Sequence, residues 1–202
     1  MKESIDLGSM IYKEPSNLNP QKGDLLVAEP MLSEPYFKRS AVLILEENKE
    51  SGHIGLTMNV RTPVNMRDLF PDWVQGEHIP LYSGGPVDAD RLFMIHSLGN
   101  EVGASLEIAP GLYVGAKLDK IVEYINDGND AEGKIRFFLG YSGWAKGQLV
   151  TELLRNSWAL NSNPDTRDIL MGAGEEYWRR EVEKLGQKYR SWLLIPSNPS
   201  FN

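Results

Sequence analysis

Glycine and aromatic residues crowd one stretch of the chain, RFFLGYSGWAKGQL at residues 136–149. If a helix begins near Lys146, its exposed N–H groups and the lysine charge could hold an anion. Tyr141, Trp144 and Gln148 could then contact a ligand or a partner. A strand-to-helix corner, with the aromatic side chains as packing anchors, explains the same residues. The stretch therefore indicates either a binding surface or an architectural hinge.

The same stretch can be tested for a serine nucleophile by its spacing. In the G-x-S-x-G elbow, glycines stand two residues before and two residues after the serine, because the turn is strained. Ser142 has Gly140 before it, but Trp144 occupies the second glycine's position. The sequence also contains no G-x-G-x-x-G, P-loop or H-E-x-x-H pattern. Dinucleotide, P-loop and zincin chemistries therefore have no support.

A second glycine-rich fragment is SGGPV at residues 83–87. Gly84 and Gly85 leave the backbone free to turn, so their N–H groups could approach an anion. A tight turn between two strands explains the pair equally well. Three polar residues near strand ends could line the same concavity: Arg39, Ser40 and Asn59.

The histidines stand too far apart for a local metal motif: His53, His78 and His96. We therefore predict no metal site, and no cofactor. His96 shares strand parity with Leu92 and Met94, which favours a buried, hydrogen-bonded imidazole. A general base is the alternative, because histidine titrates near neutral pH. Glu152 is the second candidate for an acid–base role.

Composition limits the class of protein. The hydrophobic share of 41% and the charged share of 24% are those of a soluble globular chain. The net charge of -7 opposes phosphate neutralisation, so direct nucleic-acid binding is not expected. No apolar run approaches the roughly 18 residues of a membrane span, and residues 1–21 lack a secretory signal. The absence of cysteine fits a reducing compartment. We expect a cytoplasmic protein with an unidentified protein or small-molecule partner and no membrane association.

Periodicity predicts the elements that position these residues. Strands are expected at 24–30, 40–47, 53–59, 79–87, 91–97, 111–115 and 134–141, and a last one at 191–196. Ala41 to Leu45 is apolar on both parities, as in a strand covered on both faces. Asn65 and Asp68 indicate a capped helical turn. Three longer helices are expected at 117–127, from about 146 to 156, and at 174–188.

Strands that cluster early, with helices at irregular intervals, favour an α+β fold. We predict a single compact domain with a mixed, curved β-sheet flanked by about three helices. Residues 1–22 are polar and contain two prolines, which is typical of a loosely ordered arm. The domain is expected to span residues 23–202.

The motifs also resemble a known family. GDLLVAEPMLSEPYFKRSAVLILEE, GHIGLTMN, YSGGPV, RLFMIHS, GLYVG and RFFLGYSGWAKGQLVTEL occur in the order and spacing of the AlgH/YqgE family, over about residues 22–202. The resemblance implies a compact α+β fold in a bacterial family whose biochemical activity is unsettled. Some members carry the label of transcriptional regulator. The positions that match the motifs include Arg39, Ser40, Asn59, Gly84, Gly85, His96, Gly140, Tyr141, Gly143, Trp144, Gly147, Gln148 and Glu152. No catalytic role comes with them.

Two functional hypotheses follow. The first is a non-enzymatic binding or regulatory protein, whose recognition surface includes the SGGPV turn and residues 141–152. The second is a small enzyme, in which His96 or Glu152 acts as acid or base and the glycine turn holds an anion. The second requires His96, Arg39 and the glycine turn to line one open pocket.

Overall fold

Two neighbouring strands, β1 (Leu25–Ala28) and β2 (Ala41–Asn48), form the inner part of the sheet because their side chains are apolar on both faces. Every residue of β1 and the first five of β2 are buried. These elements come from a computed structural model, which describes residues 18–48, 50–72 and 79–197. The expectation of a central strand covered on both faces is therefore confirmed for β2. The predicted arm lies, for residues 1–17, outside the described residues.

The sheet has ten strands, and eight of them follow one another in the order β10-β1-β2-β3-β9-β6-β8-β7. The remaining two, β4 and β5, pair with each other, and β5 also pairs with β9. That β5–β9 pair is parallel, whereas the other pairs are antiparallel, so the sheet is mixed. Besides β1 and β2, the strands are β3 (Gly52–Thr57), β4 (Arg61–Asn65), β5 (Pro80–Ser83), β6 (Val87–His96), β7 (Leu106–Ala109), β8 (Leu112–Val114), β9 (Ile135–Trp144) and β10 (Trp158–Asn161).

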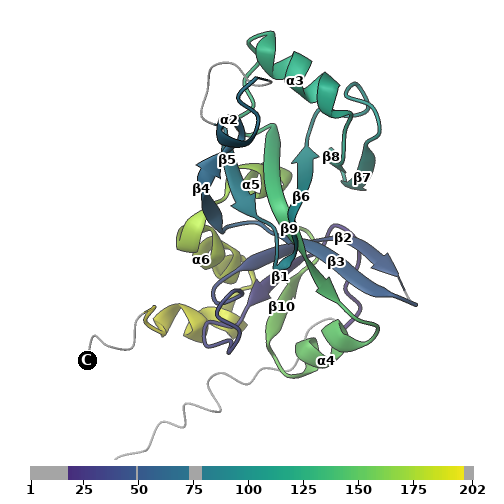
Figure 1. The fold of residues 1–202 in the computed structure, drawn as a ribbon. Coiled ribbons are helices and arrows are strands. Elements are labelled where there is room, and N and C mark those ends of the chain that lie inside the picture. The colour runs from purple at the N-terminus through teal and green to yellow at the C-terminus, as the bar shows by residue number, and fades with distance from the viewer. Residues whose placement is uncertain (1–17, 49, 73–78, 198–202) are drawn as a thin grey trace, which may run out of the picture.

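Strand β9 is shared by both halves of the sheet, as Figure 1 shows. Its first part pairs with β5 and β6, and residues 142–144 pair with β3. Gly140 has a φ of 69°, in the region that glycine tolerates, and it lies where the strand changes partners. The strand expected at 134–141 is therefore longer than predicted. The strand bends at Gly140 and continues to Trp144, and the turn into the following helix comes at Gly147, whose φ is 77°.

The described residues contain five α-helices and one 3-10 helix, more than the three expected: α2 (Met66–Leu69), α3 (Leu118–Asn126), α4 (Gln148–Leu154), α5 (Thr166–Met171), α6 (Gly174–Lys184) and η1 (Gln187–Leu194). The capped turn is confirmed, because Asn65 and Asp68 form a reciprocal capping box at the start of α2. Helix α5 is not among the helices expected from the sequence. None of these helices is long and apolar enough to cross a membrane.

The strand predicted at 191–196 is wrong, because that segment belongs to η1. Tyr189 and Trp192 are three residues apart and both buried, and their ring centroids lie 4.9 Å from each other. That spacing suits a 3-10 helix, in which side chains at i and i+3 lie over one another. The helix predicted at 174–188 is also shorter than expected, since Gly186 adopts a φ of 84° and separates α6 from η1.

Helices cover both faces of the sheet. Leu26 and Ala28 of β1 pack with α4, whereas Val27 packs with α6 and η1. Helix α3 places Ile121 and Ile125 over the first part of β9. The described residues thus form one compact domain, and its buried clusters leave an open corner between the β2–β3 hairpin and strands β6 to β8.

Candidate functional site

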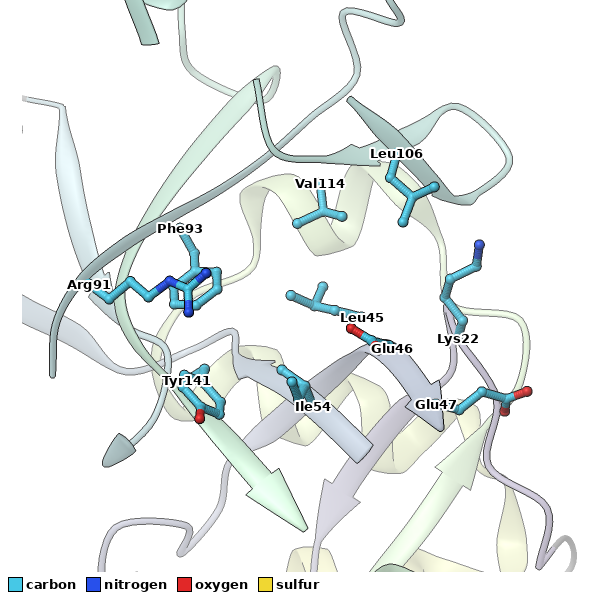
Figure 2. A pocket seen from close by; sticks show the side chains of 10 residues that line it. All are labelled: Lys22, Leu45, Glu46, Glu47, Ile54, Arg91, Phe93, Leu106, Val114 and Tyr141. Atoms are coloured by element: carbon cyan, nitrogen blue, oxygen red, sulfur yellow. The ribbon is translucent and has the colours of Figure 1, made fainter. Parts of the chain in front are cut away.

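A cavity of about 550 Å³ lies in the corner between β2, β3 and β9 on one side and β6, β7 and β8 on the other. Figure 2 shows the ten residues that line it: Lys22, Leu45, Glu46, Glu47, Ile54, Arg91, Phe93, Leu106, Val114 and Tyr141. Its volume falls in the usual range of small-molecule sites. Six lining residues are apolar or aromatic, and four are charged. The cavity thus has an apolar body with a charged rim.

A β-bulge shapes one wall of the cavity. Ile44 pairs with Gly55 and Glu46 pairs with Ile54, so Leu45 is an extra residue in β2. Successive residues of a regular strand point to opposite faces, whereas a bulge re-aims a side chain. Leu45 and Glu46 can therefore line the same cavity although they are consecutive.

Two aromatic rings form the opposite wall. Phe93 of β6 and Tyr141 of β9 meet edge to face, with centroids 5.8 Å apart. A Cβ atom added to Gly143 would lie 3.4 Å from the Tyr141 ring, so this glycine leaves the ring its space. Arg91 extends its guanidinium over Phe93, at 4.9 Å from the ring centroid. The wall thus offers an aromatic surface beside a cation.

The rim carries two positive and two negative side chains: Lys22, Arg91, Glu46 and Glu47. Lys22 donates a hydrogen bond of 3.0 Å to the Glu107 carbonyl, which fixes it beside β7. The balanced charge gives no net attraction to a polyanion. None of the ten lining residues is a histidine, serine, threonine or cysteine. The arrangement is suited to holding an amphipathic group.

Tyr141 is the one sequence-predicted site residue that lines this cavity. Trp144, Gln148 and Glu152 gather in a separate cluster at the start of α4. Glu152 Oε2 accepts hydrogen bonds from the indoles of Trp144 and Trp158, each at 2.8 Å, and Oε1 accepts from Gln148 at 2.9 Å. Both indoles are almost fully buried. Glu152 thereby ties α4 to strands β9 and β10.

Arg39, Ser40 and Asn59 form a second group, near α6. The Asn59 side-chain amide donates to the carbonyls of Arg39 and Gly174, and its oxygen accepts from the Ala41 N–H. Arg39 is buried over the Trp178 ring, donates to the Ile195 carbonyl at 2.6 Å and lies 3.3 Å from Glu175. These contacts are all within the protein and hold α6 and η1 against the sheet.

The SGGPV turn is packed against β9. A Cβ atom on Gly84 would lie 2.3 Å from the Gly140 carbonyl oxygen, and one on Gly85 would lie 1.9 Å from the backbone of Tyr141. The Gly84 N–H donates to the Leu139 carbonyl at 2.8 Å, so it is already engaged. Close approach of two backbones explains why both positions are glycine.

His96 is fully buried at the end of β6, with its ring stacked on Tyr113. Its Nε2 lies 2.8 Å from the Gly115 carbonyl oxygen, and its Nδ1 accepts the Leu98 N–H at 3.2 Å. This pairing suits a neutral imidazole with the proton on Nε2. Burial lowers the pKa of His96, and the hydrogen bond to Gly115 opposes that shift. The imidazole is therefore held neutral by its surroundings.

The residues of the enzyme hypothesis do not come together in the part of the chain that the structure describes. Three cavities of the described residues, the one above among them, are lined by neither His96 nor Arg39 nor any residue of the SGGPV turn. In the same ranges, no three His, Asp or Glu side chains gather as a metal site would need. His78 lies outside the described residues.

The sequence profile of the AlgH-like family, DUF179, matches residues 25–190, which is most of the chain. The chain belongs to the AlgH-like family. A UPF0301 protein of Parabacteroides distasonis is 43% identical over 91% of this chain and 92% of its own length. Another, from Bacteroides thetaiotaomicron, is 40% identical over 98% of this chain and all of its own length. The family's function is uncharacterised.

Two solved structures share the fold. The solution structure of the AlgH protein from Pseudomonas aeruginosa superposes with a TM-score of 0.66 at 29% identity, covering 94% of this chain and 99% of that one. Protein DIP2367 from Corynebacterium diphtheriae superposes with a TM-score of 0.68, over 90% of this chain and 94% of that one. Its identity is 22%, so this second likeness concerns the fold alone.

Sequence reasoning missed nine of the ten residues that line the cavity. These nine come from five separate strands and from Lys22, which precedes β1. One signal was present: Glu46 and Glu47 follow five buried residues in β2, so a buried strand ends in paired carboxylates. The spacing of Arg91 and Phe93 was a second signal, because residues two apart in a strand point to the same face of the sheet.

Proposed function

We propose that this AlgH-like protein is a non-enzymatic binding protein, which holds an apolar or aromatic group in the cavity beside Phe93 and Tyr141. The single observation that carries the proposal is the combination in one cavity of an apolar body and a charged rim. Its size suits a small molecule or one or two side chains of a partner protein. Arg91 over Phe93 would contact a negatively polarised part of the occupant, and the two glutamates would contact a positive part.

A regulatory role would then be indirect. The net charge of -7 opposes broad contact with DNA phosphates, so occupancy of the cavity, rather than base reading, would carry the signal. We retain the cytoplasmic location expected from the sequence as part of this proposal. Engagement of both His96 nitrogens within the protein supports binding over acid–base chemistry.

The test fills the cavity without disturbing the core. Leu106 is 58% exposed at the rim, so Leu106→Trp can project into the cavity without replacing a buried side chain. Leu154→Trp is the matched control, because Leu154 is 50% exposed on α4 and lies outside the lining. Binding of the fluorescent amphiphile 8-anilinonaphthalene-1-sulfonate is measured by titration, and retained small molecules are measured by mass spectrometry after gentle purification.

We expect Leu106→Trp to weaken binding of the amphiphile at least tenfold and to remove any retained molecule, while Leu154→Trp behaves as wild type. Equal binding by both variants would contradict the proposed site. A product formed from a retained molecule during incubation would instead favour an enzyme.

A further inference from the structure

A buried cation stands apart from the cavity just described. Arg136 of β9 is 3% exposed. Its two terminal nitrogens donate to backbone carbonyls: Nη1 to Ile169 at 2.5 Å and Nη2 to Met58 at 2.6 Å. The third donor, Nε, has no hydrogen-bond partner among the described residues. A buried donor without a partner is costly, and more so on a charged group.

The charge of Arg136 is also without a carboxylate. No Asp or Glu of the described ranges forms an ion pair with it. The Tyr82 ring lies 3.9 Å from the guanidinium carbon and the Phe138 ring 5.5 Å, so two aromatic faces offset part of the lost hydration. Burial opposes the charge and lowers the pKa of Arg136. Buried charges in proteins are usually paired.

Arg136 is one of the residues that line a second cavity, of about 300 Å³. A second arginine, Arg61 of β4, lines it as well, and Glu132 is the one acidic residue of the lining. Arg61 and Glu132 are both exposed, so they stand at the mouth, whereas Arg136 is at the bottom. The three side chains sum to one net positive charge. Apolar side chains make up most of the remaining wall: Ile79, Pro80, Ala131, Ile135, Leu170 and Met171.

We propose that this second cavity binds a small organic monocarboxylate, with its carboxylate between Arg136 and Arg61 and its apolar body against the wall. A single negative charge balances the lining, and a guanidinium presents donors that match a carboxylate. The apolar side chains of the lining can contact an organic body, which an inorganic anion lacks. The free Nε of Arg136 gains the acceptor that the protein does not provide.

The probe is benzoate, and its matched control is benzamide, which has the same shape without the charge. Titrations followed by nuclear magnetic resonance report on the Arg136 Nε–H and on the backbone amides of residues 132–136. We expect saturable shifts there with benzoate and none with benzamide at the same concentration. Inorganic phosphate is expected to shift these signals less than benzoate. Equal shifts from benzamide, or shifts from phosphate without benzoate, would overturn the proposal.

Variants test the two arginines separately. Arg61→Gln should weaken benzoate binding about fivefold, near the lower end for a charge-assisted hydrogen bond at an exposed site. Arg67→Gln, an exposed arginine on α2 outside the lining, should leave the affinity unchanged. Arg136→Lys keeps the charge but loses the planar fork, and should weaken binding more than tenfold in a variant checked for folding by its amide spectrum. Equal affinity for Arg61→Gln and Arg67→Gln would also refute the site.

This proposal is independent of the first cavity. Leu106→Trp should leave the benzoate-induced shifts at Arg136 unchanged. Benzoate shifts that map to Phe93 and Tyr141, and vanish in Leu106→Trp, would assign the anion to the first cavity and reject the second.

Discussion

The indole Nε1 of Trp144 lies 2.8 Å from Oε2 of Glu152, to which it donates a hydrogen bond. The same oxygen accepts the indole of Trp158 at 2.8 Å. One carboxylate therefore satisfies two almost fully buried donors on two different strands.

Glu152→Ala should lower the free energy of unfolding by about 2–4 kcal/mol, because it leaves two buried N–H groups without an acceptor. Glu152→Gln retains an acceptor oxygen and should lose less. Chemical denaturation measures both, with Glu183→Ala, an exposed residue of α6, as the control. A loss in Glu152→Ala no larger than in Glu183→Ala would show that the indoles find other partners.

Gly85→Ala should destabilise the protein by about 3 kcal/mol, at the upper end for overpacking, because the new Cβ atom would meet the Tyr141 backbone at 1.9 Å. Gly111→Ala is the comparison, because the φ of Gly111 is 71° and no atom lies within 4 Å of an added Cβ atom. Its only destabilisation is the strain of an alanine in the left-handed region, about 1 kcal/mol. Thermal unfolding ranks the two variants. The reverse order would mean that the SGGPV turn can move away from β9.

Acidification should weaken the fold through His96. Its pKa is lowered in the folded state, so below the ordinary value of 6.5 the unfolded chain binds the extra proton first. The free energy of unfolding should therefore fall as the pH drops from about 7 through 6.5, and this slope should be absent in His96→Gln. Asp24 and Glu29 act in the opposite direction at lower pH, because burial raises their pKa values. An unchanged slope in His96→Gln would assign the effect elsewhere.

Lys146→Ala should change stability by less than about 0.5 kcal/mol, although the ammonium lies 3.0 Å from Glu50, because both side chains are more than half exposed. Denaturation at low and high salt measures this. A loss above about 1 kcal/mol, or about fivefold in the folding equilibrium, would indicate that this corner needs the charge.

Local patterns predicted the inner strands and the cap of α2 well. The doubly apolar run at Ala41 to Leu45 gave β2, and the Asn65 cap gave α2, because both signals lie within a few neighbouring residues. The strand predicted at 191–196 was wrong, because an apolar run of this length fits a strand as well as a 3-10 helix. The structure has the 3-10 helix, in which Tyr189 packs against Trp192. The strand predicted at 134–141 continues to Trp144, because Gly140 is a bend within it and does not end it.

The cavity could not be predicted in the same way. It depends on a bulge that turns Leu45 and Glu46 to one side, and on pairings that bring Lys22, Arg91 and Tyr141 together across the sheet. The resemblance identified the family, but the residues that match its motifs serve mostly to pack strands and helices. The chemistry-bearing residue types of the sequence are thus largely engaged inside the fold.

The pairing of β1 with β10 has a consequence for synthesis. Leu25 is synthesised long before Asn161, its partner in the finished sheet. Strand β3 is likewise synthesised long before residues 142–144, with which it pairs. Until then, both strands expose an unpaired edge, which can pair with another nascent chain. A pause late in translation would lengthen the time for which these edges stay unpaired.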